Sequence, residues 1–257
     1  MADVKRANVL FLDKKYEEAA EAYYEGARDG DPECAFNYAY CLLTGTGVER
    51  DERAAKSFFT FATELRGGDA AYNLAVMYLH GVGVKRDYKK VYSYMYDAAR
   101  GGCIEAQLYL GIAHTLGAIF EPDVICISRI PFHTPIFRSS GMLLEGEVPF
   151  DEEDEELRFA AVRLDPNTAF QWFKIAARHD STYTKEYSLK SKFLYARCFV
   201  DGLGTEFNRD KAEKLMLLAA HEGSQDAVDY IATEAPYLLE RLGDKDYMKR
   251  LASGGAN

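Results

Sequence analysis

Three short glycine motifs of the same shape recur along the chain. They are GTGV at residues 45–48, GVGV at 81–84 and GLGT at 202–205. A phosphate-binding loop would follow a strand, and no strand pattern precedes these glycines. Each motif comes directly after a segment with helical periodicity, where a glycine can adopt the left-handed conformation that ends a helix. The motifs therefore predict helix ends at Gly45, Gly81 and Gly202 and argue against a nucleotide site.

The glycine motifs belong to a longer unit with a period near 36 residues. Its copies start at residues 34, 70, 106 and 191, and a shorter copy, AVDYIATEA, starts at 227. Each of the four full copies opens with a small residue and has an apolar or aromatic residue four positions later, followed by another small residue. This is helical spacing, and a fixed period of this length is typical of solenoids built from helical hairpins.

A second helix is predicted after each glycine turn. Asp51, Asp87 and Asn208 stand four residues after the second glycine of their motifs. Each side chain can accept a hydrogen bond from the free N–H groups of a helix's first turn. An alanine follows eleven residues after each cap, and a glycine then ends the segment. The pattern predicts that antiparallel helix pairs follow one another along the chain.

The third copy is interrupted by a long insertion, residues 118–164. Its second helix is predicted to begin at Asp165 with Pro166 in the first turn. Residues 124–137 are β-branched and aromatic and contain two prolines, which predicts an ordered extended segment that narrows one side of a groove. The acidic residues 151–159 predict an exposed helix start or a mobile stretch. A second insertion, residues 181–187, is expected to lengthen the turn into the fourth copy.

Composition narrows the classes of function. The chain has 257 residues, of which 48% are hydrophobic, and 31 Lys and Arg against 41 Asp and Glu give a net charge of -10. This charge disfavours nucleic acids and anionic lipid surfaces. No leader or membrane-spanning stretch is evident, so we expect a cytoplasmic protein without nucleic-acid or membrane partners. The five cysteines are odd in number and lack Cys-x-x-Cys spacing, which predicts buried thiols.

Catalytic and metal-binding motifs are not found. The five histidines have no metal-ligand spacing, and no nucleophile elbow is present. The acidic run at residues 151–156 lacks the alternating ligands and turn glycine of a calcium loop. We therefore predict no catalytic residue, no metal and no cofactor.

The helix with small residues, the G-x-G-V-x-x-D turn and the Ala-Ala-x-x-Gly ending together resemble the Sel-one-like repeat (SLR) family, a relative of tetratricopeptide (TPR) repeats. Residues 70–102 are the best match. The resemblance implies an all-α fold, a right-handed α-solenoid of stacked antiparallel helix pairs with one long insertion. It also implies a protein-binding scaffold without catalysis of its own.

We expect a single SLR/TPR-like solenoid over residues 1–257. Its expected parts are N-terminal capping helices at 1–30, repeats at 34–68, 70–102, 106–180 and 191–223, the insertion at 118–164, and C-terminal capping helices at 224–257.

The resemblance also predicts a binding surface, because the first helix of each unit lines the concave side in these families. The inward-facing positions are Phe36, Asn37, Tyr40, Tyr72, Asn73, Val76, His80, Leu108, Ile112, Phe193 and Arg197. Aromatic and apolar side chains of this kind can anchor a peptide. Asn37 and Asn73 hold matching positions, and their amides can bind an extended peptide backbone. An ordinary hydrogen bond between helices is an equal alternative for them.

Three functions remain open. The leading one is a non-catalytic scaffold or adaptor that captures a peptide or protein on its concave groove and insertion. Acidic residues at the rim would favour a basic or neutral partner; they are Glu33, Asp69, Glu105 and Asp201. An alternative is an enzyme or small-molecule receptor with a pocket between the insertion and the groove, using His114 or His133. A third is a self-associating spacer, which apolar surface on terminal helices such as residues 237–242 would indicate.

Overall fold

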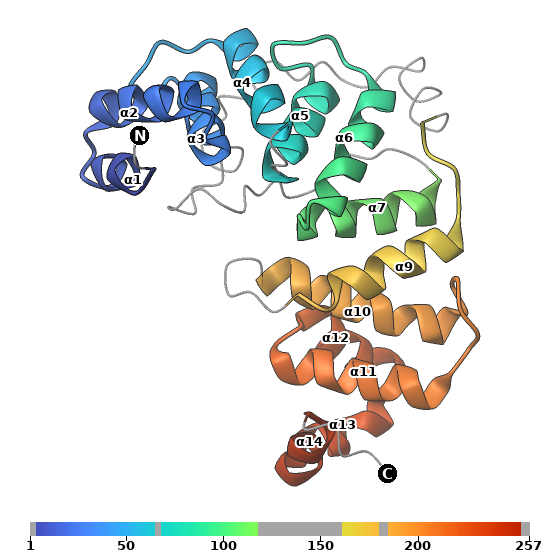
Figure 1. The fold of residues 1–257 in the computed structure, drawn as a ribbon. Coiled ribbons are helices and arrows are strands. Elements are labelled where there is room, and N and C mark those ends of the chain that lie inside the picture. Colours follow the sequence, from blue (N-terminus) through green and yellow to red (C-terminus); the bar gives the residue numbers. More distant parts are fainter. Residues whose placement is uncertain (1–3, 65–67, 118–160, 180–184, 253–257) are drawn as a thin grey trace. The chain divides into compact units, whose positions relative to one another are not determined.

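The computed structural model describes residues 4–64, 68–117, 161–179 and 185–252, and over these residues the chain is helical with no strand. The helices form stacked antiparallel pairs, so the predicted all-α solenoid of helix pairs is confirmed (Figure 1). Among the described residues, two compact units can be distinguished. The first comprises residues 4–106 with 161–162, and the second comprises 107–117 with 163–252. Each unit is described by itself.

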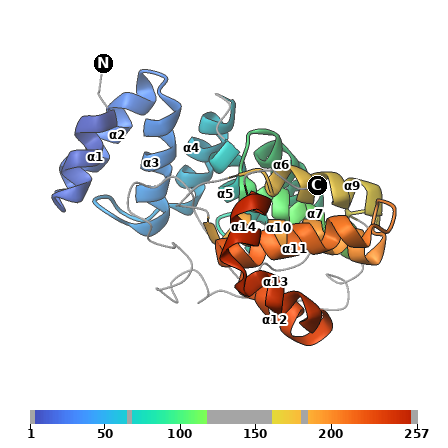
Figure 2. The same ribbon diagram turned by 90° about the horizontal axis from the view of Figure 1, so that it is seen from below.

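The first unit contains three helix pairs, and each helix packs against the next (Figure 2). The pairs are α1 (Val4–Leu12) with α2 (Tyr16–Arg28), α3 (Pro32–Thr44) with α4 (Glu52–Glu64), and α5 (Gly68–His80) with α6 (Tyr88–Arg100). Small residues allow this close packing, because the alanines predicted eleven residues after the caps, Ala62 and Ala98, are at most 1% exposed.

The second unit is also built from helices that follow one another along the chain, and it ends in shorter ones. Its elements are most of α7 (Ile104–Leu116), then α9 (Pro166–Ala176), α10 (Lys185–Asp201), α11 (Arg209–Glu222), α12 (Gln225–Glu234), η1 (Pro236–Leu238), α13 (Leu239–Gly243) and α14 (Lys245–Ala252). Both α13 and α14 lie against α11 (Figure 2). A core of Ala219, Ile231, Leu238 and Met248 joins α11 to these C-terminal elements.

The first glycine of each motif ends a helix, as the sequence predicts. Gly45, Gly81 and Gly202 directly follow α3, α5 and α10, with φ of 72°, 75° and 67°. A β-carbon disfavours this left-handed conformation. The helix ends predicted by the motifs are therefore confirmed.

The second glycine of each motif has a different role, which the sequence analysis did not assign. Gly47, Gly83 and Gly204 also have positive φ. Each lies directly on the first turn of the second helix of the preceding pair, so a β-carbon on Gly83 would lie 2.7 Å from Cβ of Glu52. A β-carbon on Gly204 would lie 2.0 Å from the carbonyl oxygen of Pro166. Successive pairs therefore stack through a close contact with backbone and Cβ atoms that only glycine permits.

The predicted helix caps are confirmed. Oδ1 of Asp51 accepts from the backbone N–H of Ala54 at 2.9 Å, and Oδ1 of Asp87 accepts from Lys90 at 3.1 Å. Oδ1 of Asn208 accepts from the N–H of Lys211 at 3.0 Å. Asp165 caps α9, where the hydroxyl and N–H of Thr168 lower the pKa of the Asp165 carboxyl.

The start of the fourth copy differs from the prediction. Residues 185–187 were expected in a lengthened turn, but they form the first residues of α10, which has 17 residues where α3 and α5 have 13. The hydroxyl of Ser188 donates to the carbonyl of His179 at 2.5 Å, which holds the extended helix start against the chain that leaves α9. Residues 181–184 and the predictions for residues 124–137 and 151–159 lie outside the described part.

The described cysteines are buried thiols, as predicted. Cys34, Cys41, Cys103 and Cys198 are buried and form no disulfide with one another. Burial raises the pKa of the Cys41 and Cys198 thiols to about 12, so both are protonated at neutral pH. Cys126 lies outside the described residues.

Candidate protein-interaction surfaces

The predicted binding residues of the first unit lie on α3 and α5, and most of them are buried. Phe36, Asn37 and Tyr40 belong to α3, whereas Tyr72, Asn73, Val76 and His80 belong to α5. Only His80 is partly exposed. The Phe36 ring packs edge-on against Phe59 of α4, and the Tyr40 ring against Phe11 of α1. These two rings therefore fill the space between helices, and their role in binding a partner stays a prediction.

Asn37 and Asn73 form what we call the amide pair. They are 4% and 2% exposed. Nδ2 of Asn37, and both Nδ2 and Oδ1 of Asn73, have no hydrogen-bond partner among the described residues. The interhelix hydrogen bond that the sequence left open is thus not formed by these atoms within the described chain. An unpaired buried amide costs about 1–3 kcal/mol, so two at matching repeat positions need an explanation.

Two predicted residues of the second unit lie on α7. Leu108 is buried in a cluster with Phe173 and Phe199, and the half-buried Ile112 packs against the same cluster. Gly111 between them lies so close to Phe173 that a β-carbon would be 2.4 Å from the ring. The close approach of α7 and α9 explains why this position is small.

Phe193 and Arg197 on α10 are half-exposed and meet a residue that the sequence analysis missed, Tyr230 of α12. The Phe193 and Tyr230 ring centroids are 6.3 Å apart, and the guanidinium carbon of Arg197 lies 5.1 Å from the Tyr230 ring centroid. Arg197 also pairs with Asp201 at 3.0 Å. We call Phe193, Arg197, Asp201 and Tyr230 the α10 cluster.

Burial raises the pKa of Tyr230, so its phenol stays neutral. Tyr230 is the fourth residue of the short fifth copy, the position of Asn37 in the first, and this register was available in the sequence.

A network of charged side chains joins α11 to the chain end. Glu213 accepts hydrogen bonds from Nε of Arg209 at 2.9 Å, from the Tyr237 hydroxyl at 2.8 Å and from Arg241 at 3.3 Å. Burial favours the protonated carboxyl, but these donors outweigh it, and the pKa of Glu213 lies below its usual value. The network holds η1 and α13 to the first half of α11.

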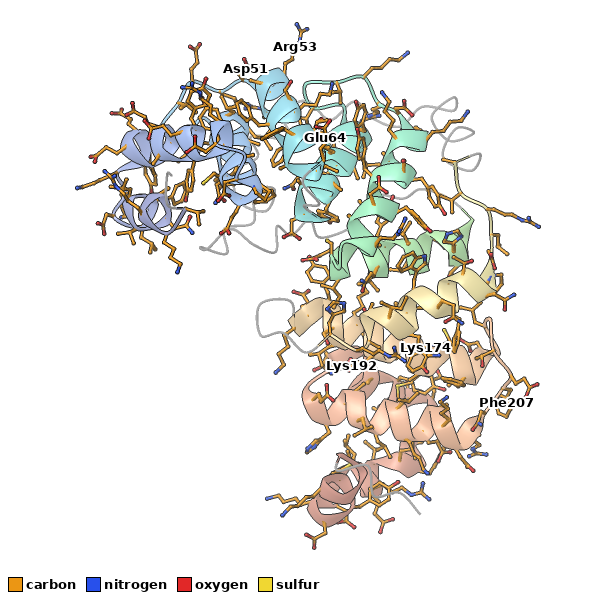
Figure 3. The ribbon with its side chains drawn as sticks, in the orientation of Figure 1. Asp51, Arg53, Glu64, Lys174, Lys192 and Phe207 are labelled. Atoms are coloured by element: carbon orange, nitrogen blue, oxygen red, sulfur yellow. The ribbon has the colours of Figure 1, made fainter. Side chains whose placement is uncertain are left out.

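The first unit has a broad, shallow depression of about 1090 Å³ along its turns. Its lining includes Asp51 and Arg53, which lie at the start of α4 (Figure 3). The helix-capping carboxylate of Asp51 and the Arg50–Glu52 ion pair at 2.5 Å occupy part of this edge. Charges of both signs alternate here, and the surface shows no convergence of groups on one point.

Catalytic and metal chemistry gains no support from the described residues. They contain no group of three or more His, Cys, Asp or Glu side chains placed to hold a metal ion. Nδ1 of His114 lies 3.0 Å from the carbonyl oxygen of Arg163, whereas His133 lies outside the described part. Glu105, predicted at an acidic rim, is buried, and the Cys103 thiol donates to it at 3.2 Å.

None of the described helices is long and apolar enough to cross a membrane.

Comparison with known sequences identifies the repeat. A sequence model of the Sel1 repeat matches residues 32–66, 68–103, 160–181 and 189–224, about half of the chain. The chain belongs to the Sel1 repeat family. The first two matches each cover one helix pair, α3 with α4 and α5 with α6. The resemblance to SLR proteins is thereby confirmed, and Sel1 repeats generally serve as scaffolds for protein interactions. No curated protein matches the chain in sequence.

A solved structure agrees on the fold. The crystal structure of a Sel1 repeat protein from Oxalobacter formigenes is 17% identical, with alignment over 99% of this chain and 86% of that chain and a TM-score of 0.67. At this identity the likeness shows the fold alone. A second structure, c5321, is a protective antigen of uropathogenic Escherichia coli strains with an SLR fold. It is 14% identical over 98% of this chain and 60% of its own, with a TM-score of 0.41.

Proposed function

We propose that this Sel1 repeat protein is a non-catalytic, cytoplasmic scaffold or adaptor that captures an extended segment of a partner protein. The observation that carries the proposal is the amide pair, Asn37 and Asn73, with unpaired amide atoms at the same position of successive repeats. The alternative is an enzyme or small-molecule receptor with a pocket between the insertion and the groove, and the insertion lies almost entirely outside the described residues.

The chemistry of a primary amide matches an extended backbone. An extended peptide presents a carbonyl and an N–H at each residue, and an asparagine side chain offers both a donor and an acceptor. Asn37 of α3 and Asn73 of α5 are spaced by one repeat, so one segment can meet both in turn. A partner that satisfies these atoms removes the free-energy cost that they carry in the free protein.

Access to the amide pair requires movement. Because Asn37 and Asn73 are almost fully buried, a partner can reach them only when the covering side chains shift. Binding that depends on such a change associates more slowly than the usual 10⁵–10⁷ M⁻¹s⁻¹ that is typical of rigid docking, on the order of tenfold or more. Slow association is therefore an expected signature of this site.

The α10 cluster offers a second, more accessible contact in its own unit. Phe193, Arg197 and Tyr230 present two rings and a cation, all partly exposed. Aromatic faces of this kind bind apolar side chains with little loss of conformational entropy. We propose that this cluster holds an aromatic or aliphatic side chain of the partner.

Peptides selected from a random display library on the full-length protein would supply a defined probe. Their affinity and association rate would then be measured for the wild type, for the double variant Asn37→Leu with Asn73→Leu, and for Phe193→Ala. We expect the amide variant to lose binding at least about tenfold, because leucine keeps the side-chain volume and removes the hydrogen-bonding groups.

A matched control is Asn167→Leu, since Asn167 is an exposed asparagine on α9 outside both surfaces. This control should bind like the wild type. Selected peptides that bind the amide variant and Phe193→Ala as tightly as the wild type would refute both proposed contacts.

A further inference from the structure

The last complete helix pair has a helix start with no glycine turn on it. At three described turns the second glycine covers the first turn of the second helix of the preceding pair: Gly47 covers Tyr16, Gly83 covers Glu52 and Gly204 covers Pro166. The corresponding cover for α11 would come from a glycine turn after α12. However, α12 has only 10 residues where α3 and α5 have 13, and the chain passes into η1 instead. The start of α11 therefore lacks the glycine turn that the repeat would place there.

A cavity of about 310 Å³ lies at this position. We call it the C-terminal slot. Its apolar lining includes Val200, Ala212, Met216 and Leu238. Two rings also line it and are strongly exposed, Phe207 at 66% and Tyr237 at 50%. Phe207 stands on the turn between α10 and α11, at the edge of the second unit (Figure 3). Two strongly exposed rings beside an apolar cavity are typical of a contact surface.

The slot carries one available negative charge. Glu213 is already bonded to Arg209, Tyr237 and Arg241, so it has little capacity for another donor. Glu234 also lines the slot, is exposed, and forms no ion pair with any residue that the structure describes. The slot therefore suits an apolar side chain beside a basic one.

The turn between α1 and α2 has this chemistry. We call residues 12–15 the N-terminal turn; Leu12 is 55% exposed and all four residues are exposed. Lys14, with φ of 60°, and Lys15 outweigh the single carboxylate of Asp13. Val9 of α1 adds a further exposed apolar side chain, at 54%.

We propose that the N-terminal turn of one copy of this chain occupies the C-terminal slot of a second copy. Leu12 then packs between Phe207 and Tyr237, and Lys14 or Lys15 pairs with Glu234. Within each unit, a turn stacks on the start of a helix. The proposed contact repeats this stacking between two molecules. Because the two surfaces differ, the association is head-to-tail and can extend beyond a dimer. It goes beyond the proposed function, since it needs neither the amide pair nor Phe193 and Arg197, although Tyr230 of the α10 cluster also lines the slot.

Sedimentation velocity of the full chain over a concentration series tests the proposal. The weight-average sedimentation coefficient of the wild type should rise with concentration. Phe207→Glu and Leu12→Glu should each weaken association at least about tenfold, because each places a charge in the contact. Tyr96→Glu is the matched control, since this ring on α6 is 41% exposed and lies outside both surfaces. It should associate like the wild type, and far-ultraviolet circular dichroism should show that all variants fold.

Mixing the two defective variants gives the sharpest readout. Phe207→Glu retains an intact N-terminal turn and Leu12→Glu retains an intact slot, so an equimolar mixture should form a discrete dimer that neither forms alone. Glu234→Lys should weaken association, and combining it with Lys14→Glu and Lys15→Glu should restore it. A wild type that stays monomeric up to millimolar concentration overturns the proposal. So does a mixture that fails to form the dimer, because this indicates a different or symmetric interface.

Discussion

Asn73 in α5 and Leu194 in α10 hold the same position in their repeats, the fourth residue of each copy, but they differ in chemistry and surroundings. Asn73 is 2% exposed and its amide is unpaired among the described residues, whereas Leu194 is half-buried and packs on an apolar cluster. The neighbouring predicted residues differ likewise: Tyr72 and Val76 are buried, but Phe193 and Arg197 are partly exposed. The repeat register thus determines the position of a residue on its helix, but it does not determine the burial or the packing partners of that residue.

The turns show the opposite behaviour, because both units use them in the same way. Gly83 lies on the start of α4 in the first unit, and Gly204 lies on the start of α9 in the second. In both cases the nearest atoms are backbone atoms and a Cβ, which almost all sequences share. The stacking contact is therefore preserved while the inner helix face varies, and this division allows repeats of one family to present different surfaces.

The largest expected effect concerns this shared contact. Gly83→Ala and Gly204→Ala should each lower the free energy of unfolding by about 3 kcal/mol, because alanine adds both a strained φ and an overlap with backbone atoms. Gly81→Ala should cost only about 1 kcal/mol, since its nearest neighbour is Cγ of the flexible Arg86 side chain at 3.4 Å. Urea unfolding followed by circular dichroism measures all three.

The control for this prediction is internal to the motif. Gly81 and Gly83 have similar φ, 75° and 63°, so the strain is similar and the difference between their variants reports the overlap with Glu52. Equal losses in the free energy of unfolding for Gly81→Ala and Gly83→Ala would show that the contact of the turn with the start of α4 is unimportant for stability. A large cost at Gly83 with none at Gly204 would break the equivalence of the two units.

Local sequence signals predicted the helix boundaries well, because each boundary depends on nearby chemistry. Gly45, Gly81 and Gly202 end helices through their own conformation, and Asp87 and Asn208 cap helices through bonds to residues three positions later. The start of α10 was missed because the register of the copy set it at residue 191. The helix extends beyond that register, and the bond between Ser188 and His179 is not visible as a motif.

Contacts between distant residues could not be predicted in the same way. In the sequence, the second glycine of each motif is indistinguishable from an ordinary turn residue. Only the contacts of these glycines with Tyr16, Glu52 and Pro166 explain why no β-carbon is tolerated there. The burial of the rings on α3 also depends on partners such as Phe59 and Phe11, which lie on other helices. Tyr230 differs from these residues, because its position in the fifth copy could be predicted from the repeat.

The second prediction exchanges the residues that differ between the units. Asn73→Leu should raise the free energy of unfolding by about 1–2 kcal/mol, because it replaces an unpaired buried amide with an apolar group of similar size. Leu194→Asn should lower it by about 1–2 kcal/mol, because it removes apolar contact and adds a polar group to the cluster around Phe170 and Phe199. Thermal or urea unfolding of the two single variants measures both.

The signs decide the interpretation. A destabilising Asn73→Leu would mean that the amide has a partner that stabilises the free protein, and the contrast between the two positions would then disappear. Stabilisation together with loss of peptide binding would show that the first unit retains a costly group because its partner uses it.

The units also differ in how a helix start is secured at the end of the array. In the first unit, Gly83 covers the start of α4 through contacts with backbone and Cβ atoms, which do not titrate. In the second unit, the start of α11 is held by Glu213 with Arg209, Tyr237 and Arg241. This network depends on an ionised carboxylate, so stability at this end should depend on pH.

The smallest expected effect tests this pH dependence. Burial opposes ionisation of Glu213, but its hydrogen bonds dominate and lower its pKa in the folded protein. A lowered folded pKa contributes stability above the ordinary glutamate value of about 4.3, and that contribution is lost as the pH falls through the folded value. Glu213→Gln should therefore cost up to about 1 kcal/mol at pH 7 and progressively less as the solution is acidified below that value. Urea unfolding at both ends of this range measures the difference, with Glu240→Gln as the control because Glu240 is an exposed carboxylate of α13. If Glu213→Gln costs the same at both pH values, the network acts through packing alone, and the two units secure their helix starts in physically similar ways.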